Sequence, residues 1–255
     1  MSGSDRRTEA IYLDYNATAP VKPEVSEAIA EALSITGNPS SVHQFGRDAR
    51  DAVETARDRV AAMIGARPED IVFTAGGTEA NNMALNGARR RRLVISAIEH
   101  PSILRAAESI ADSTSRGNEK ELEVLPVDSL GVVSLQALDQ VLGENADDVL
   151  VSIMLANNET GVIQPVADIA TLAHERGALV HCDAVQAPGR IAFDVAALGV
   201  DMLSLSAHKF GGPKGIGALF VAGAFDLEPL IVGGGQERSR RPGTENVAGI
   251  VGFGV

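Results

Sequence analysis

Short apolar runs that alternate with longer amphipathic segments constrain the fold of this chain more than any other feature. The candidate strands are 71–73, 93–96, 122–125, 149–154, 178–181, 202–205 and 217–221. The candidate helices, which have apolar residues at spacings of three and four, are 23–33, 43–64, 78–88, 101–110, 135–142 and 166–174. Strands that alternate with helices predict an α/β fold with a mostly parallel sheet and helices on both faces.

The last two candidate strands are separated only by the Gly-rich turn that follows Lys209. A crossover between parallel strands needs about a dozen residues, so we expect strand 217–221 to run antiparallel to the others. At the other end of the chain, residues 1–10 read as a loose tail and 11–13 as a short strand. Gly65 is a natural end for the long helix before it.

Composition excludes several classes of function. The net charge is −12, with 22 basic and 34 acidic residues, which disfavours nucleic-acid binding. No apolar run approaches the ~18 residues of a membrane span, and no signal peptide is visible at the N-terminus. Cys182 is the single cysteine, so no disulfide framework forms within the chain. We therefore expect a cytoplasmic protein that binds neither nucleic acid nor membrane.

Lys209 lies just after the candidate strand 202–205 and before a turn rich in Gly and Pro. Such a turn lets the backbone approach a ligand closely. A lysine at a strand end can point into a crevice, lose its proton by desolvation and form a Schiff base with an aldehyde. The alternative is an exposed lysine on a flexible loop.

Further polar residues follow other strands, at the sheet edge where ligands bind in folds of this type. Gly77 and Thr78 form either an anion-binding helix start or an ordinary capped turn. His100 is either a ring in the site or a structural histidine, and Asp183 either a site carboxylate or a helix cap. The remaining candidates at strand ends are Asn158, Gln186, Ser206 and His208.

Together these residues favour pyridoxal phosphate as the cofactor. They supply a lysine, an anion cradle, a flat ring, amides, and a carboxylate that keeps the pyridine nitrogen protonated. A nucleotide is disfavoured, because the chain has neither a P-loop nor a G-x-G-x-x-G pattern. A metal is also disfavoured, because His100, His181 and His208 lack paired ligand spacing and Cys182 is alone.

At these residues the sequence resembles the cysteine desulfurase family, within the class V aminotransferase group of fold-type I pyridoxal-phosphate enzymes. The matching stretches occur in family order across nearly the whole chain. They are 12–20, 38–43, 73–82, Glu99-His100, 157–161, His181 to Gln186, 206–217 and Arg241-Pro242-Gly243-Thr244.

The resemblance implies a role for each candidate. Lys209 would be the Schiff-base lysine and proton-transfer base, and Asp183 would face the pyridine nitrogen. His100 would stack on the ring and assist proton transfer. The ring oxygen would contact Asn158 and Gln186, and the phosphate would be held by Gly77, Thr78, Ser206 and His208. Thr244 would reach the phosphate of a neighbouring subunit, which implies a homodimer.

The implied reaction converts L-cysteine to L-alanine and passes the sulfur on as a persulfide. An acceptor or scaffold protein for iron–sulfur cluster or thio-cofactor assembly would then be a partner. The same cofactor residues also fit another class V enzyme, such as an aminotransferase or selenocysteine lyase. A third alternative is a non-catalytic, truncated subunit that binds a partner.

The resemblance also implies a domain division. Residues 1–15 would be an N-terminal arm that belongs to the small domain, and 16–255 the cofactor-binding large domain. Because the chain stops within an apolar helical pattern after Val247, we expect a fragment that lacks most of the small domain. The family's sulfur-accepting cysteine lies in the missing part, and Cys182 reads instead as a small core residue.

Overall fold

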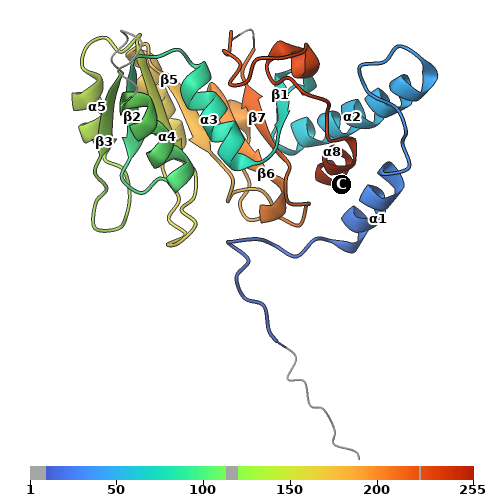
Figure 1. Ribbon diagram of the computed structural model, residues 1–255. Helices are drawn as coiled ribbons and strands as arrows, with labels where there is room; N and C mark the ends of the chain where they lie inside the picture. The colour runs from blue at the N-terminus through green and yellow to red at the C-terminus, as the bar shows by residue number, and fades with distance from the viewer. Residues whose placement is uncertain (1–9, 113–119, 224) are drawn as a thin grey trace, which may run out of the picture.

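A seven-stranded sheet forms the centre of the protein (Figure 1). The structure is a computed structural model that describes residues 10–112, 120–223 and 225–255. The strands are β1 (Ile71–Thr74), β2 (Arg92–Ser96), β3 (Glu121–Leu125), β4 (Val149–Met154), β5 (Leu179–Asp183), β6 (Met202–Ser206) and β7 (Gly217–Val221). Their order in the sheet is β1-β7-β6-β5-β4-β2-β3.

Only one strand of this sheet opposes the others. β7 pairs antiparallel with both β6 and β1, while β2, β3, β4, β5 and β6 pair in parallel. In the register of β7, Gly217 lies opposite Ser206 on one side and Thr74 on the other. The predicted α/β class and the predicted antiparallel strand 217–221 are both confirmed.

Helices cover both faces of the sheet, because buried side chains of each strand alternate between the faces. The α-helices are α1 (Pro23–Ala32), α2 (Gln44–Met63), α3 (Gly77–Gly87), α4 (Pro101–Asp112), α5 (Leu135–Leu142), α6 (Val166–Glu175), α7 (Val195–Leu198) and α8 (Val247–Phe253). On β1, Ile71 and Phe73 join the core that includes α2, α5, α6 and α8, whereas Val72 joins the core under α3 and α4.

One expectation about local structure was wrong, and one short helix was missed. Residues 11–13 form no strand, because they pair with none of the seven strands, and the Tyr12 hydroxyl instead donates to the backbone oxygens of Asp14 and Thr18. The short helix α7 was not predicted, although Asp194 caps it by accepting from the Ala196 and Ala197 N–H groups. Gly65 does follow the long helix with φ +69°, as expected. The predicted loose tail 1–10 lies almost wholly outside the described residues.

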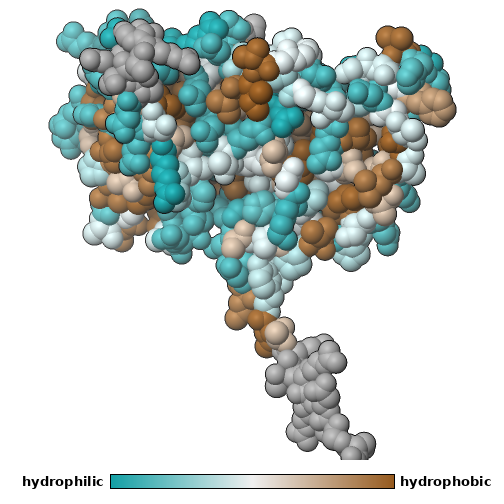
Figure 2. All heavy atoms as spheres, viewed as in Figure 1, coloured by the Kyte–Doolittle hydropathy of each residue, from teal (hydrophilic) through white to brown (hydrophobic). Residues whose placement is uncertain are grey.

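The chain from residue 10 to the first helix carries exposed apolar side chains. Ile11 is 83% exposed and Leu13 82% exposed. The space-filling view shows the beginning of this segment extending away from the body of the molecule, whereas Asn16 is hydrogen-bonded to Asn158 and Gln186 (Figure 2). In the part of the chain that the structure describes, no helix combines the length and the apolar character needed to cross a bilayer.

A buried ion pair connects the long helix α2 to the loop that precedes α8. Arg57 donates to both carboxylate oxygens of Glu237, at 2.8 and 2.7 Å, and Glu237 also accepts from the Phe73 N–H at 2.8 Å. Glu237 adopts a left-handed backbone conformation with φ 45°, which is uncommon for a residue with a side chain. The ion pair therefore holds the loop in a conformation that its backbone alone disfavours.

We predict that Glu237→Ala destabilises the protein by about 3–5 kcal/mol, because it removes the buried partner of the Arg57 guanidinium and leaves this charge paired with Glu54, whose side chain is 42% exposed. Urea unfolding followed by circular dichroism would measure the change in the free energy of unfolding. The matched control is Glu228→Ala, which breaks a half-exposed pair with Arg89 and should cost less than about 1 kcal/mol. Equal losses for the two variants would contradict the prediction.

Candidate active site

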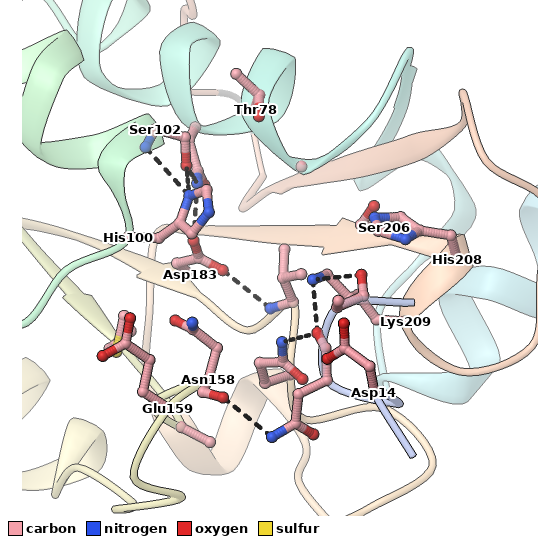
Figure 3. A pocket seen from close by; sticks show the side chains of 18 residues that line it. Asp14, Thr78, His100, Ser102, Asn158, Glu159, Asp183, Ser206, His208 and Lys209 are labelled. Atoms are coloured by element: carbon pink, nitrogen blue, oxygen red, sulfur yellow. Dashed lines mark hydrogen bonds between the residues drawn. The ribbon is translucent and has the colours of Figure 1, made fainter. Parts of the chain in front are cut away.

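Nine of the ten candidate residues line one cavity at the carboxyl ends of the central strands. The cavity has a volume of about 550 Å³ and lies beside the start of α3 (Figure 3). The candidates that line it are Gly77, Thr78, His100, Asn158, Asp183, Gln186, Ser206, His208 and Lys209. Parallel strands place their carboxyl ends along one edge, which explains how such distant parts of the sequence meet.

Lys209 enters this cavity from the short 3₁₀ turn Ala207–Lys209, which directly follows β6. Its ammonium group donates to the backbone oxygens of Asn16 at 2.7 Å and Ala17 at 3.0 Å. Partial burial is the main cause that lowers the pKa of Lys209, and the charge of Arg190 lowers it further. A lysine with a lowered pKa is closer to the neutral amine that attacks an aldehyde.

Asp183 is the last residue of β5 and lies in the wall of the same cavity. One carboxylate oxygen accepts from the Val185 N–H at 3.0 Å, and the other accepts from the Asn81 side-chain amide at 2.8 Å. Burial raises the pKa of Asp183, while these two hydrogen bonds and the nearby His100 and Lys209 oppose the rise. Asp183 is no helix cap, because the next helix begins only at Val195, and it shares a cavity with Lys209.

His100 is both a structural residue and part of the cavity wall. It precedes α4, and its Nδ1 accepts from the backbone N–H of Ser102 at 3.1 Å, as a helix N-cap does. The hydroxyl of Ser102 lies 2.8 Å from the same nitrogen. The two alternatives for this histidine are thus combined, since the ring that caps α4 also lines the cavity.

The turn before α3 brings the backbone close to β6. Gly76 has φ 153°, and α3 begins at Gly77. A Cβ on Gly77 would lie 2.8 Å from a methyl group of Val185 and 3.5 Å from the Cβ of Ser206, so a side chain has no room there. The first N–H groups of a helix lack partners within the helix, and those of α3 are available to an anion beside Ser206.

Two amide side chains complete the cavity near the N-terminal segment. Gln186 donates from Nε2 to the backbone oxygen of Asn16 at 2.9 Å. Its Oε1 is buried and has no hydrogen-bond partner among the described residues. Asn158 accepts at its backbone oxygen from the Asn16 side chain at 3.0 Å. Segment 14–17 therefore closes the cavity from the side opposite α3.

Thr244, the tenth candidate, does not line this cavity. It lies in a smaller hollow of about 210 Å³ together with Glu237, Arg241 and residues of β1. Arg241 is held there by Glu79, whose carboxylate also accepts from the Ala75 N–H in the turn before α3. The expectation that Thr244 serves a neighbouring subunit stays a prediction.

Several cavity residues were not among the candidates. The polar ones are Asp14, Asn16, Asn81, Ser102 and Glu159. Asn81 had a usable signal, because it lies one helical turn after Gly77 and therefore on the same side of α3. The contribution of Asp14 and Asn16 depends on a loop that crosses from the far end of the chain, which no local pattern reveals.

Comparison with known proteins agrees with this geometry. The sequence profile described as Aminotransferase class-V matches residues 11–255. The chain belongs to the class V aminotransferase family. It is 45% identical to a cysteine desulfurase IscS of Dictyoglomus turgidum, over 96% of this chain and 62% of the relative. A cysteine desulfurase of Nostoc is also 45% identical, over 96% of this chain and 61% of its own length.

Solved structures show the same architecture. The NifS-like protein of Rickettsia africae superposes with a TM-score of 0.87 at 40% identity, covering 96% of this chain and 67% of that one. A structure described as SspA in complex with cysteine superposes with a TM-score of 0.87 at 36% identity, covering 96% and 71%. The chain thus spans about three fifths of the length of the curated relatives it matches. The predicted relationship to cysteine desulfurases is confirmed. The predicted division into an N-terminal arm, residues 1–15, and a large domain, residues 16–255, stays a prediction. Residues 1–9 of this arm lie outside the described structure.

Cys182 is fully buried in the sheet next to Asp183, on the face that packs against the α2 and α6 layer. Burial, followed by the charges of Asp183 and Glu99, raises the pKa of this thiol well above its usual range. A buried, protonated thiol is a poor nucleophile.

Within the described ranges, no group of three or more His, Cys, Asp or Glu side chains is arranged to hold a metal ion.

Glu99 lies behind the cavity and is only 4% exposed. One carboxyl oxygen accepts from the Ser96 hydroxyl at 2.6 Å and from the Met154 N–H at 2.9 Å, and the other has no partner in the described part of the chain. Burial is the main cause that raises the pKa of Glu99 from 4.5 to about 8. The buried side chain is therefore mostly a neutral acid at pH 7.

We predict that this group makes the protein less stable as the pH rises from about 5 to about 8. The folded state then holds a proton that the unfolded state has lost, so the free energy of unfolding falls by up to about 1.4 kcal/mol per pH unit. Glu99→Gln imitates the neutral acid and should remove this slope in urea unfolding. The control Glu144→Gln, at an exposed position, should keep it. An unchanged slope in Glu99→Gln would refute the assignment.

Proposed function

We propose that this chain provides the cofactor site of a pyridoxal-phosphate-dependent cysteine desulfurase, which converts L-cysteine to L-alanine. The observation that carries the proposal is that Lys209 and Asp183 line a single cavity, each from the end of a neighbouring strand. The relatives named as cysteine desulfurases support the reaction. The related structure in complex with cysteine favours that substrate over other amino acids of class V enzymes.

The residues present fit the cofactor. A side chain at Gly77 would run into Val185, so the backbone at the start of α3 lines the cavity without one, and a helix start is suited to a phosphate. Buried amide oxygens of Asn81 and Gln186 lack partners among the described residues, as expected for a cavity built around a polar ligand. When bound, pyridoxal phosphate supplies an electron sink for the carbon next to the substrate amine.

Each candidate has a task in this proposal. Lys209 would hold the aldehyde covalently and then move the α-proton of the substrate, which its lowered pKa favours. Asp183 would pair with the pyridine nitrogen, and His100 would lie against the ring. Gly77, Thr78, Ser206 and His208 would bind the phosphate, and Asn158 and Gln186 the ring oxygen.

The conversion to alanine with transfer of sulfur needs a second thiol. A thiolate would attack the substrate sulfur and form an S–S bond as the C–S bond breaks, and the C–S electron pair would stay with the carbon fragment, which takes up a proton to become alanine. Cys182 does not fit this role, since its side chain is fully buried. The acceptor in our proposal is a thiolate outside these 255 residues, either elsewhere in a longer polypeptide or on a partner for iron–sulfur cluster or thio-cofactor assembly. A homodimer, in which Thr244 serves the neighbouring cavity, is also part of the proposal.

We predict that borohydride reduction of the chain with bound pyridoxal phosphate attaches the cofactor at Lys209. Peptide mapping by mass spectrometry identifies the modified residue. Lys209→Ala should abolish the label, while Lys214→Ala, five residues along the same turn, should leave it at Lys209. A label that is absent, or present only at other lysines, would rule out the proposed function.

We also predict that Cys182 gains no persulfide when the cofactor-loaded chain is incubated with L-cysteine, because the thiol is buried and protonated. A persulfide-specific alkylating tag, read by mass spectrometry, would test this. Sulfide release by this chain that disappears in Cys182→Ala would contradict the assignment of Cys182 to the core.

A further inference from the structure

Three consecutive hydrogen-bond contacts connect the Asp183 carboxylate to the His100 ring, through two residues outside the ten candidates (Figure 3). Asn81 Nδ2 donates to Asp183 Oδ2 at 2.8 Å and to Ser102 Oγ at 2.8 Å. Ser102 Oγ lies 2.8 Å from His100 Nδ1. Both amide protons of Asn81 are therefore used, one toward the carboxylate and one toward the histidine.

Elementary chemistry fixes the direction of these bonds. A reversed Asn81 amide would place its oxygen against the carboxylate of Asp183, which only accepts when ionised. Ser102 Oγ accepts from Asn81, so its own proton is free for His100 Nδ1. The backbone N–H of Ser102 also points at Nδ1, at 3.1 Å, and an N–H group only donates. In the neutral ring, Nδ1 is thus the acceptor and the proton lies on Nε2.

The buried side chain of Asn81 makes these two bonds at a cost in free energy. Its side chain is 1% exposed, and its Oδ1 is buried without a partner among the described residues. An unpaired buried oxygen is costly, and an apolar residue at this position would avoid it. The side chain is therefore explained by its two donors rather than by packing.

We propose that Asn81 and Ser102 are positioning residues that fix the tautomer of His100 and the orientation of the Asp183 carboxylate. As a result, His100 offers the Nε2 proton as a donor and Asp183 offers its carboxylate as an acceptor to a ligand in the cavity. The role rests on the proposed function, because it concerns the two side chains that would contact the cofactor ring. The hydrogen-bond chain itself is present without any ligand and is tested separately.

The first experiment uses the cofactor-free chain with ¹⁵N-labelled histidine. Long-range ¹H–¹⁵N spectra distinguish protonated from unprotonated ring nitrogens, and His100→Gln identifies the His100 signals by their loss. The expected result is a proton on Nε2 in the wild type. Ser102→Ala should move the Nδ1 signal toward that of a nitrogen without a hydroxyl donor, and Ser102→Thr, which keeps the hydroxyl, should restore it.

Asn81→Ala should shift the same signal in the same direction, because the Ser102 hydroxyl loses the donor that orients it. The matched control is Asn86→Ala, which removes an amide that donates to the backbone oxygen of Asn82 in the same helix. It should leave the His100 signals unchanged. A wild-type ring protonated on Nδ1, or His100 signals that stay at the wild-type position in both Asn81→Ala and Ser102→Ala, would overturn the proposal.

The second experiment measures the Kd of pyridoxal phosphate by absorbance titration. Asn81→Ala should weaken binding by about tenfold, the effect of one lost hydrogen bond to a charged group, whereas Asn86→Ala should not. Equal affinities would overturn the positioning role. A wild-type chain that gives no borohydride label at Lys209 would instead remove the proposed function, and the histidine spectra would still decide whether the hydrogen-bond chain sets the tautomer.

Discussion

The buried carboxylate of Asp183 is the constraint on which the cavity depends. A carboxylate at the end of a central strand loses its water and must be compensated by hydrogen bonds and nearby positive charge. The Val185 N–H and the Asn81 amide supply the bonds, and Lys209 opposes the rise in its pKa. Three parts of the chain are therefore held around one group, and the cavity forms between them.

The strands behind Asp183 also carry buried polar side chains that compensate one another by hydrogen bonds. His181 lies two residues earlier on β5 and, through the alternation of a strand, on the same face. Its ring nitrogens contact the hydroxyls of Ser152 on β4 and Ser204 on β6, each at 2.9 Å. Burial lowers the pKa of His181 to about 3, so the ring stays neutral and all three side chains are paired. This row of polar side chains ties the central strands together directly below the cavity.

Much of the fold could be predicted from local patterns. Buried strands such as 149–154 are nearly continuous apolar runs, amphipathic helices such as 135–142 have apolar residues at helical spacing, and the antiparallel β7 follows from the short connection before it. The segment 11–13 shows where this reasoning fails. Its apolar residues resemble a strand, but a strand also needs a neighbouring edge, and the sequence does not show whether one is available.

In the candidate site, too, some residues could be predicted from the sequence and others could not. Lys209, Asp183, His100 and the Gly77 turn were predicted, because residues at the carboxyl ends of parallel strands meet at one edge of the sheet. The sequence by itself determined these residue types and the edge they occupy. Only the tertiary structure decided that Asn81 and Ser102 connect Asp183 to His100, and that segment 14–17 closes the cavity over Lys209. Those contacts depend on side-chain directions and on packing between elements far apart in the chain, which no local spacing encodes.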